Sequence, residues 1–339
     1  MTRLTRLLAI AALGAFAALG APMTPLVPMA EAQQVNPTAE SVTEDKLFEA
    51  LRGDQMIEGR ASIPDPKAPG LIKPGNKGWA ETHTSTIRAL TIWTMIGMVA
   101  LLAVFYAYRG RIRIDAGPAG RTIKRFGGVE RFAHWLMAVS FILLALTGLN
   151  LVLGRSVLLP MIGEAAFGSL SASGKIVHNY MGWAFMLGLA LAFVVWVGRN
   201  LPKSHDLTWF AMGGGLFKKG VHPPAGKFNG GQKLIFWSVV VGGAALSFTG
   251  VMLLFPAIAG TQADWQLYQL IHGIAAALLT AVILAHIYIG SIGMEGAFDA
   301  MGSGEVDLNW AREHHSLWVE EVEGKSAAPH GSGRVAPAE

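Results

Sequence analysis

The stretch QLIHGIAAALLTAVILAHIYIG, residues 269–290, decides the fold class of this chain. It contains no Asp, Glu, Lys or Arg, and at ~1.5 Å per residue it is long enough to cross a ~30 Å hydrocarbon core as a helix. His272 and His286 interrupt it. Because ionisable side chains inside a membrane are costly and are usually functional, both histidines are candidate site residues.

The rest of the chain repeats this apolar pattern. Of its 339 residues, 52% are hydrophobic and only 15% are charged, which is typical of membrane proteins. Apolar segments long enough to span a bilayer lie at 87–108, 133–154, 177–198, 234–255 and 268–292. The sequence therefore predicts an all-α integral membrane protein. Its net charge of +4 comes from basic loops between the spans, which does not indicate a nucleic-acid partner.

The loops predict the orientation of the spans. Loops 109–131 and 199–233 are rich in Lys and Arg, whereas 155–177 contains two basic residues and 256–267 contains none. The positive-inside rule places the two basic loops in the cytoplasm. With an exported N-terminus, five crossings also place the C-terminus in the cytoplasm.

The N-terminal part predicts export. Arg3 and Arg6 precede a short apolar core and the small-residue site Ala30-Glu31-Ala32, as in a secretory signal peptide cleaved after Ala32. An uncleaved membrane anchor is the alternative. Residues 33–84 are polar and rich in Pro and Gly, so they are expected to form a periplasmic arm with no core of its own.

The chain contains no cysteine. This excludes thiolate-held iron–sulfur clusters, disulfides and the C-x-x-C-H attachment of c-type haem. Any redox centre held by this chain must use nitrogen or oxygen ligands.

Four of the ten histidines fall within the spans: His134, His178, His272 and His286. In the expected orientation, His134 lies at the cytoplasmic start of its helix, and His178 and His272 lie at the outer starts of theirs. Fourteen residues place His286 about 21 Å deeper than His272 and within about 40° of the same helix face. We therefore expect His178 to pair with His272 near the outer surface, and His134 with His286 near the cytoplasmic surface.

Two facing imidazole pairs within a four-helix arrangement suit bis-histidine ligation of two b-type haems. Zinc and copper also bind imidazole, but ligands about 21 Å apart on one helix cannot share one ion. A transporter or channel that relays protons through histidine is an alternative, although these helices contain almost no Asp or Glu. A structural anchor with vestigial ligands is another. The other histidines are expected to be solvated surface residues: His83, His205, His222, His314, His315 and His330.

A faint internal repeat divides the last four spans into two hairpins. HWLMAVSFILLALTG (134–148) and FWSVVVGGAALSFTG (236–250) share their length, the Trp at the second position and a terminal Thr-Gly. Phe236 stands where His134 stands in the first copy. The Thr-Gly pairs give a flat ring room to approach the backbone, or they serve ordinary small-residue helix packing.

The stretch GKFNGGQKLIFW, residues 226–237, ends the second basic loop. Read alone, Asn-Gly-Gly is a turn before a helix. Asn229 and Gln232 carry amides that can also hydrogen-bond a quinone carbonyl, and Gly231 permits close approach.

The chain resembles the cytochrome b (gamma) subunit of membrane-bound respiratory formate dehydrogenase. The resemblance covers roughly residues 121–323 and rests on VERFAHW (129–135), GKIVHNYMG (174–182), KFNGGQKLIFWS (227–238), LIHGIAAALLTAVILAHIYI (270–289) and EHHSLWVEE (313–321). It implies a four-helix transmembrane dihaem cytochrome b core, with two b haems on the four histidines paired as above. It also implies a quinone site beside the inner haem at Asn229, Gly231 and Gln232. The span at 87–108 has no counterpart in the short form of this family.

The expected organisation is a signal peptide (1–32), an exported arm (33–84), an extra transmembrane helix (85–110), the dihaem domain (111–298) and a cytoplasmic tail (299–339). The resemblance implies partners that hold the chemistry this chain lacks. These are an iron–sulfur (beta) subunit and a catalytic molybdenum or tungsten (alpha) subunit. Electrons would pass through the two haems to quinone, and formate oxidation would occur in the alpha subunit. The alternative is the cytochrome b subunit of a nickel–iron hydrogenase or of another quinone-linked oxidoreductase.

Overall fold

The computed structural model describes residues 78, 79 and 81–327. The predicted signal peptide, most of the predicted arm and His330 lie outside the described residues. Five helical segments are long and apolar enough to cross a membrane: Thr82–Arg109, Gly128–Val157, Glu164–Arg199, Gly230–Leu254 and Gln262–Gly293. This confirms the five predicted spans, and each helix extends beyond its apolar segment by at least one residue at one end.

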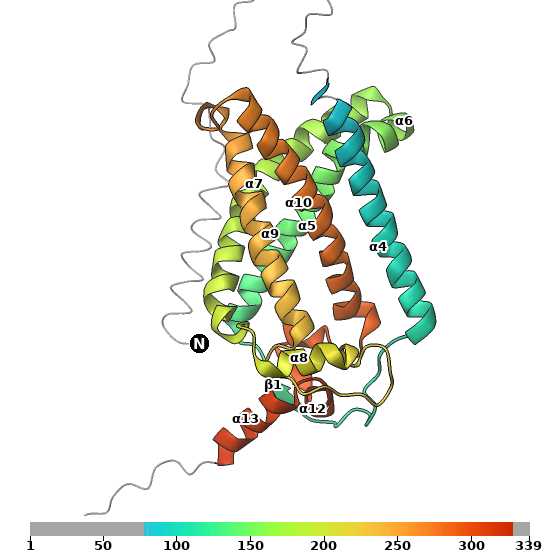
Figure 1. Cartoon of the computed structure of the whole chain (residues 1–339), viewed down its shortest axis with the longest axis vertical. Coiled ribbons are helices and arrows are strands. Elements are labelled where there is room, and N and C mark those ends of the chain that lie inside the picture. Colours follow the sequence, from blue (N-terminus) through green and yellow to red (C-terminus); the bar gives the residue numbers. More distant parts are fainter. Residues whose placement is uncertain (1–77, 80, 328–339) are drawn as a thin grey trace, which may run out of the picture. The chain divides into compact units, whose positions relative to one another are not determined.

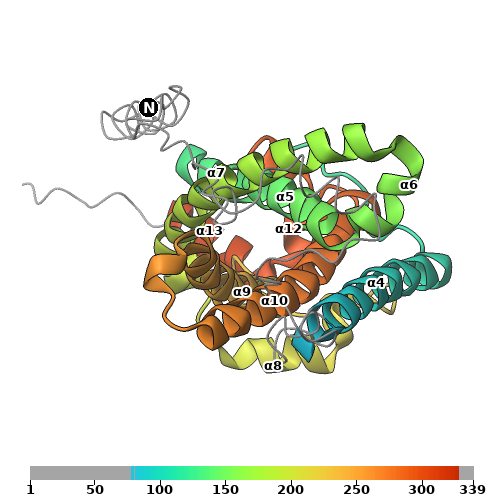
Figure 2. The ribbon, with the colours of Figure 1, turned by 90° about the horizontal axis from the view of Figure 1, so that it is seen from above.

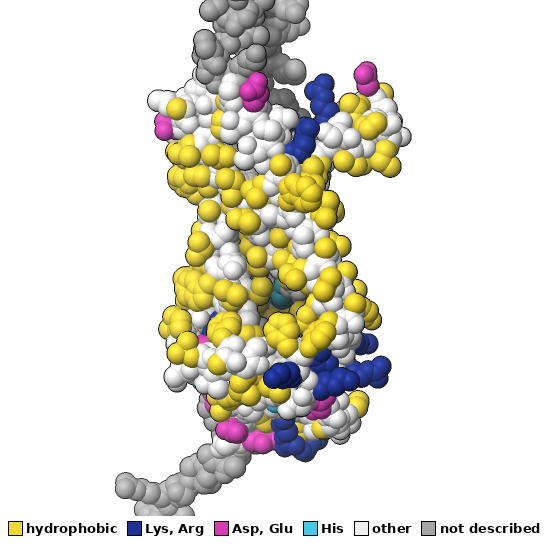
Figure 3. All heavy atoms as spheres, turned by 45° about the vertical axis from the view of Figure 1, so that its right-hand side comes forward, with side chains coloured by type: hydrophobic (Ala, Val, Ile, Leu, Met, Phe, Trp, Pro, Cys, Tyr) yellow, Lys and Arg dark blue, Asp and Glu magenta, His cyan; other side chains and the backbone are white. Residues whose placement is uncertain are grey.

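The spans expose their apolar side chains outward. In the apolar 18-residue stretch of each span, at most 22% of the residues are buried within the protein. Figure 3 shows the resulting band of hydrophobic side chains around the helices, with Lys, Arg, Asp and Glu gathered at its two ends. Such a surface is stable only in an apolar medium, so the chain is a multi-pass membrane protein.

Four helices form two antiparallel hairpins (Figure 1). Helix α5 (Gly128–Val157) is joined to α7 (Glu164–Trp196) by the short α6 (Leu159–Ile162). Helix α9 (Gly230–Leu254) is joined to α10 (Gln262–Tyr288) by a 3₁₀ turn at Pro256–Ile258. A layer of buried apolar side chains packs between the hairpins: Phe141, Phe185, Leu189, Val239 and Leu279.

A glycine sets the crossing of α5 and α7. A Cβ atom on Gly188 of α7 would lie 2.7 Å from the backbone nitrogen of Met137 on α5 and 2.8 Å from its Cα. Because the neighbour is backbone, a larger side chain cannot be accommodated by a change of rotamer. The α5–α7 hairpin therefore depends on this glycine.

The extra helix α4 (Arg88–Arg109) continues a π-helical segment, η2 (Thr82–Ile87). Figure 2 shows α4 on the outer side of α10. Ile87 is 1% exposed, and a Cβ on Gly273 would lie 2.9 Å from its Cδ1 atom. The glycine thus lets α4 approach α10 at the residue after His272.

The predicted basic loops and the tail fold together at one end of the bundle, and we call this end the cap. Its two-stranded antiparallel sheet pairs β1 (Thr122–Lys124) with β2 (Glu305–Asp307). Its helices are α8 (Ser204–Ala211), α11 (Asp299–Gly302), α12 (Leu308–His314) and α13 (Ser316–Ala327). Aromatic side chains dominate the buried cluster beneath them: Phe126, Trp196, Phe228, Phe236, Trp310 and Trp318. The sequence was expected to form basic loops and a cytoplasmic tail here, and the packed core was not predicted.

Candidate haem and quinone sites

The four histidines within the spans form two opposed pairs. His134 on α5 faces His286 on α10, with ring centroids 6.2 Å apart and ring planes at 61°. His178 on α7 faces His272 on α10, with centroids 6.3 Å apart and planes also at 61°. One helix thus contributes a ring to both pairs, and the structure brings together the residues that the sequence analysis paired.

These separations fit two imidazoles bound to opposite sides of one metal ion. A metal–imidazole nitrogen bond is about 2.0–2.1 Å, and a ring nitrogen lies about 1.1 Å from the ring centre, so trans ligands have centroids about 6.3 Å apart. The two observed separations agree with this value. Edge-to-face ring contacts also occur at about 4.5–7 Å, so ligation is indicated by two opposed histidine pairs at two depths rather than by the spacing alone.

Threonine hydroxyls fix the tautomer of the pair far from the cap. The Thr147 Oγ1 atom donates to the Leu143 carbonyl at 2.7 Å and lies 2.8 Å from His178 Nδ1. Since its one proton is used on the carbonyl, the hydroxyl accepts from Nδ1–H, which leaves the Nε2 lone pair of His178 for a metal.

The second hairpin repeats this arrangement. Thr249 Oγ1 donates to the Ala245 carbonyl at 2.7 Å and lies 2.9 Å from His272 Nδ1. Gly148 and Gly250, which follow the two threonines, lie against the Cε1 atoms of these histidines. The Thr-Gly pairs of the sequence repeat therefore hold equivalent histidines in equivalent ways.

Within the described part of the chain, no hydroxyl contacts the ring nitrogens of the pair nearer the cap. The Nδ1 atom of His134 is buried and has no hydrogen-bond partner among the described residues. His286 is exposed although it lies within a span. Figure 3 shows a histidine side chain at the floor of a hollow in the apolar band. Neutral nitrogen donors beside open apolar space suit a large planar apolar cofactor.

The predicted quinone residues lie at the N-terminus of α9, where two of them cap the helix. The Asn229 side-chain oxygen accepts from the backbone N–H of Gln232 at 2.9 Å, and the Gln232 Oε1 atom accepts from the backbone N–H of Asn229 at 3.1 Å. A Cβ on Gly231 would lie 2.7 Å from the Cη2 atom of Trp209. The helix cap and the contact with Trp209 are therefore enough to explain the residue type at all three positions. The capping leaves the side-chain NH₂ groups of Asn229 and Gln232 without an acceptor among the described residues.

A family model described as prokaryotic cytochrome b561 matches residues 125–304, more than half of the chain. The chain belongs to this family. A cytochrome b binds haem, and the donor set described above fits one.

Curated relatives refine the comparison. The nitrate-inducible formate dehydrogenase cytochrome b556(Fdn) subunit of Escherichia coli K12 is 31% identical over 208 residues, which cover 60% of this chain and 93% of that protein. The formate dehydrogenase cytochrome b556(fdo) subunit of the same strain is 28% identical over 204 residues, 59% and 93% of the two chains. A formate dehydrogenase cytochrome b556 subunit of Haemophilus influenzae is 26% identical over 217 residues, 56% and 79%. These relatives confirm the resemblance found from the motifs.

Helices α4, α12 and α13 lie outside the segment that matches the cytochrome b561 family.

The prediction for His315, in the tail, was wrong. His315 was expected to be solvated, but it is fully buried beneath α12 and α13. Burial, and next the guanidinium of Arg125, hold the pKa of His315 well below its usual range. The signal that could have found it is the pair Trp310 and Trp318, which flank His315 in the sequence and are both buried, one on α12 and one on α13.

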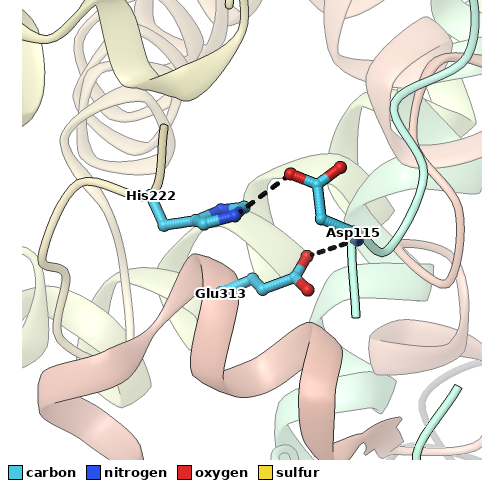
Figure 4. A group of neighbouring side chains, drawn as sticks. All are labelled: Asp115, His222 and Glu313. Atoms are coloured by element: carbon cyan, nitrogen blue, oxygen red, sulfur yellow. Dashed lines mark hydrogen bonds and ion pairs between the residues drawn. The ribbon is translucent and has the colours of Figure 1, made fainter. Parts of the chain in front are cut away.

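A second polar cluster in this cytochrome joins three segments of the cap (Figure 4). Asp115, His222 and Glu313 bring their oxygen and nitrogen atoms within 4.8 Å of one another. Both Glu313 oxygens accept backbone N–H groups, from Asp115 at 3.0 Å and Ala116 at 2.8 Å. Asp115 Oδ2 accepts from the Gly220 N–H at 2.9 Å and lies 3.1 Å from His222 Nε2. These carboxylates are engaged in tying the cap together, which accounts for their proximity.

Proposed function

We propose that this chain is the membrane cytochrome b subunit of a formate dehydrogenase, with two b haems and a quinone site. The observation that carries the proposal is an opposed imidazole pair at each of two depths along α10, with ring centroids 6.2 and 6.3 Å apart, and each pair would hold one haem. The relatives named as formate dehydrogenase cytochrome b556 subunits, matched over 93% of their length, support the formate assignment.

His178 and His272 hold one haem, and His134 and His286 hold the other. A bis-histidine haem supplies one-electron transfer at an iron whose potential depends on its ligands and surroundings. The chain's part is to hold four neutral imidazoles in place and to enclose the macrocycles in apolar helices. Thr147 and Thr249 orient the first pair through Nδ1.

The cap is assigned to the cytoplasm of a bacterial inner membrane. It contains both basic loops, as the positive-inside rule requires, and the predicted signal peptide at 1–32 supports export of the arm at 33–84. Residues 85–110 then form the extra span, 111–298 the dihaem domain and 299–339 the cytoplasmic tail. In this orientation His178 and His272 form the outer pair, and His134 and His286 form the inner pair.

Partner subunits supply formate oxidation and the route to the outer haem. A chain without cysteine cannot itself bind iron–sulfur clusters through thiolates. The proposed partners are an iron–sulfur (beta) subunit and a catalytic molybdenum or tungsten (alpha) subunit on the outer side. The outer pair, His178 and His272, would hold the haem that receives the electrons, and the inner pair, His134 and His286, would hold the second haem. Asn229, Gly231 and Gln232 would bind the quinone that accepts the electrons.

Purification of the complex from membranes tests the proposal. We expect two b haems per chain, both reduced by formate, and a molybdenum or tungsten subunit that co-purifies. A nickel–iron hydrogenase subunit in its place would overturn the formate assignment while leaving the cytochrome intact. Absence of a reduced b-type absorption band would favour the proton-relay alternative.

Thr249→Val tests the orientation of the outer pair. The valine keeps the side-chain shape but removes the hydroxyl that accepts from His272 Nδ1. Loss of such a partner typically weakens ligation by about 10–100-fold, so we expect a lower haem content and a shifted outer-haem potential in a redox titration. Ser140→Ala is the matched control, because the Ser140 hydroxyl bonds only to carbonyls of its own helix. Equal titration curves for the two variants would contradict the role of Thr249.

Replacement of Asn229 tests the quinone site. Asn229→Ser keeps an oxygen at the N-cap of α9 but removes the amide NH₂ group, so the helix cap is retained. We expect formate-dependent quinone reduction to fall about tenfold while formate still reduces both haems. Unchanged quinone turnover would remove Asn229 from the site.

A further inference from the structure

Arg125 is a buried cation to which no carboxylate of the described residues is bonded. Its side chain is among the buried residues of the cap, with the guanidinium carbon 5.0 Å from the Phe126 ring centre and 5.1 Å from that of Trp310. Burial is the main cause that lowers its pKa, to about 9, so Arg125 still carries its charge at neutral pH. A buried charge needs hydrogen-bond acceptors, and those of Arg125 all belong to other segments of the cap.

The three acceptors of Arg125 come from the turn that precedes α9, from the first turn of α9 and from the C-terminal tail. Its Nη2 atom lies 2.8 Å from the Lys227 carbonyl, 2.8 Å from His315 Nε2 and 3.2 Å from Gln232 Oε1. Since this nitrogen carries two protons, one of them is shared between acceptors. The first strand of the cap is thereby tied both to the turn and to the C-terminal helices.

His315 can accept from Arg125 only in one neutral tautomer. Its Nδ1 atom lies 2.7 Å from the Gly226 carbonyl and must donate to it, which leaves Nε2 as the acceptor. A protonated ring would present a proton to the guanidinium and would place two cations in contact. The low pKa that burial causes keeps the ring neutral.

The capping geometry and Arg125 together fix the direction of the Gln232 amide. Its oxygen faces two donors, the Asn229 backbone N–H at 3.1 Å and the Arg125 Nη2 at 3.2 Å. The flipped amide would direct its NH₂ group at both donors and is excluded. The NH₂ group of Gln232 therefore lies on the other side of the carboxamide, with no acceptor among residues 81–324.

We infer that Arg125, held by His315, is a positioning residue that presents the Gln232 NH₂ group as a hydrogen-bond donor to a quinone carbonyl. The inference rests on the quinone site proposed above. The Asn229 oxygen likewise accepts from the Gln232 backbone N–H, so each of the two amides offers its NH₂ group as the unused donor. The site accordingly takes a ligand that accepts hydrogen bonds, which is the property of the oxidised quinone.

The test uses the whole complex in membranes, with decylubiquinone or menadione as the electron acceptor. Gln232→Glu keeps an oxygen toward Arg125 but removes the NH₂ group, and Gln232→Ala removes both. We expect each variant to raise the KM for the quinone about tenfold, with little change in kcat and with formate-reducible haem intact. Wild-type KM in Gln232→Glu with a raised KM in Gln232→Ala would overturn the donor role.

Arg125→Lys tests the positioning role, because lysine keeps the charge, but its shorter side chain does not reach the Nη2 position from which all three acceptors are contacted. We expect a KM raised about tenfold, and no further rise when Arg125→Lys is combined with Gln232→Ala. If the KM increases of the two single variants multiply in the double variant, the two residues act independently, and the positioning role of Arg125 is overturned. Arg199→Lys is the control, because Arg199 bonds to Glu321 of α13 on the exposed surface and does not contact the turn; its KM should equal that of the wild type.

Two outcomes separate this inference from the proposal beneath it. If Gln232→Ala and Asn229→Ser both leave quinone reduction unchanged, the quinone site itself is wrong. If both impair it but Arg125→Lys does not, the site stands and the positioning role of Arg125 is wrong. Loss of the haem spectrum in Arg125→Lys would assign Arg125 to the scaffold of the cap and would also overturn positioning.

Discussion

His286→Ala is expected to leave one haem per chain instead of two. The substitution removes one imidazole of the inner pair, whose partner His134 has a buried Nδ1 atom without a hydrogen bond among the described residues. A single remaining histidine without a fixed orientation should not retain the cofactor. The outer pair lies about 21 Å away along α10 and keeps both ligands and both threonine partners, so its haem should remain.

A haem count and a redox titration measure this result. We expect a single b-type centre, still reduced by formate, and quinone reduction close to background. His222→Ala is the control, because His222 is exposed in the cap and contacts Asp115, so two haems should remain. Two haems per chain in His286→Ala would contradict the pairing.

Gly188→Val is expected to prevent assembly of both haem sites. A valine at this position would place its Cβ 2.7 Å from the Met137 backbone nitrogen, so α5 and α7 must move apart. Overpacking of this kind costs about 1–3 kcal/mol even where side chains can yield, and here the obstacle is backbone. Because α5 supplies His134 and α7 supplies His178, their separation disturbs one ligand of each pair.

The yield of haem-containing complex and its thermal midpoint measure the effect. Gly168→Val in the same helix is the matched control, because a Cβ on Gly168 meets nothing within 4 Å. We expect the control to keep two haems and the Gly188 variant to lose most of both. Equal yields from the two variants would show that the α5–α7 crossing does not depend on this glycine.

The membrane-spanning part of the fold could be predicted because a bilayer imposes simple rules on sequence. Apolar length defined the five spans, and helical geometry placed His286 on the same face as His272 but at a different depth. The same geometry is why one helix was expected to serve both pairs. The Thr-Gly repeat drew attention to the two threonines. The contacts of their hydroxyls with His178 and His272 were not predicted.

The cap could not be predicted in the same way, because its structure depends on pairing between distant segments. Strand β1 pairs with β2 across more than 180 residues, and each strand is only three residues long. Arg125 and His315 looked like ordinary polar residues of a loop and a tail. Only the tertiary arrangement shows that the two side chains contact each other inside an aromatic core, Arg125 through Nη2 and His315 through Nε2.

The shared helix α10 also determines where the chain can tolerate a change in length. One residue inserted between His272 and His286 would rotate the second ring by about 100° relative to the first, and it would then face away from α5. The interval of fourteen residues is therefore expected to be invariant in working members of this family. The turn at Pro256–Ile258, which joins α9 to α10 outside the ligand-bearing interval, is free to lengthen or shorten.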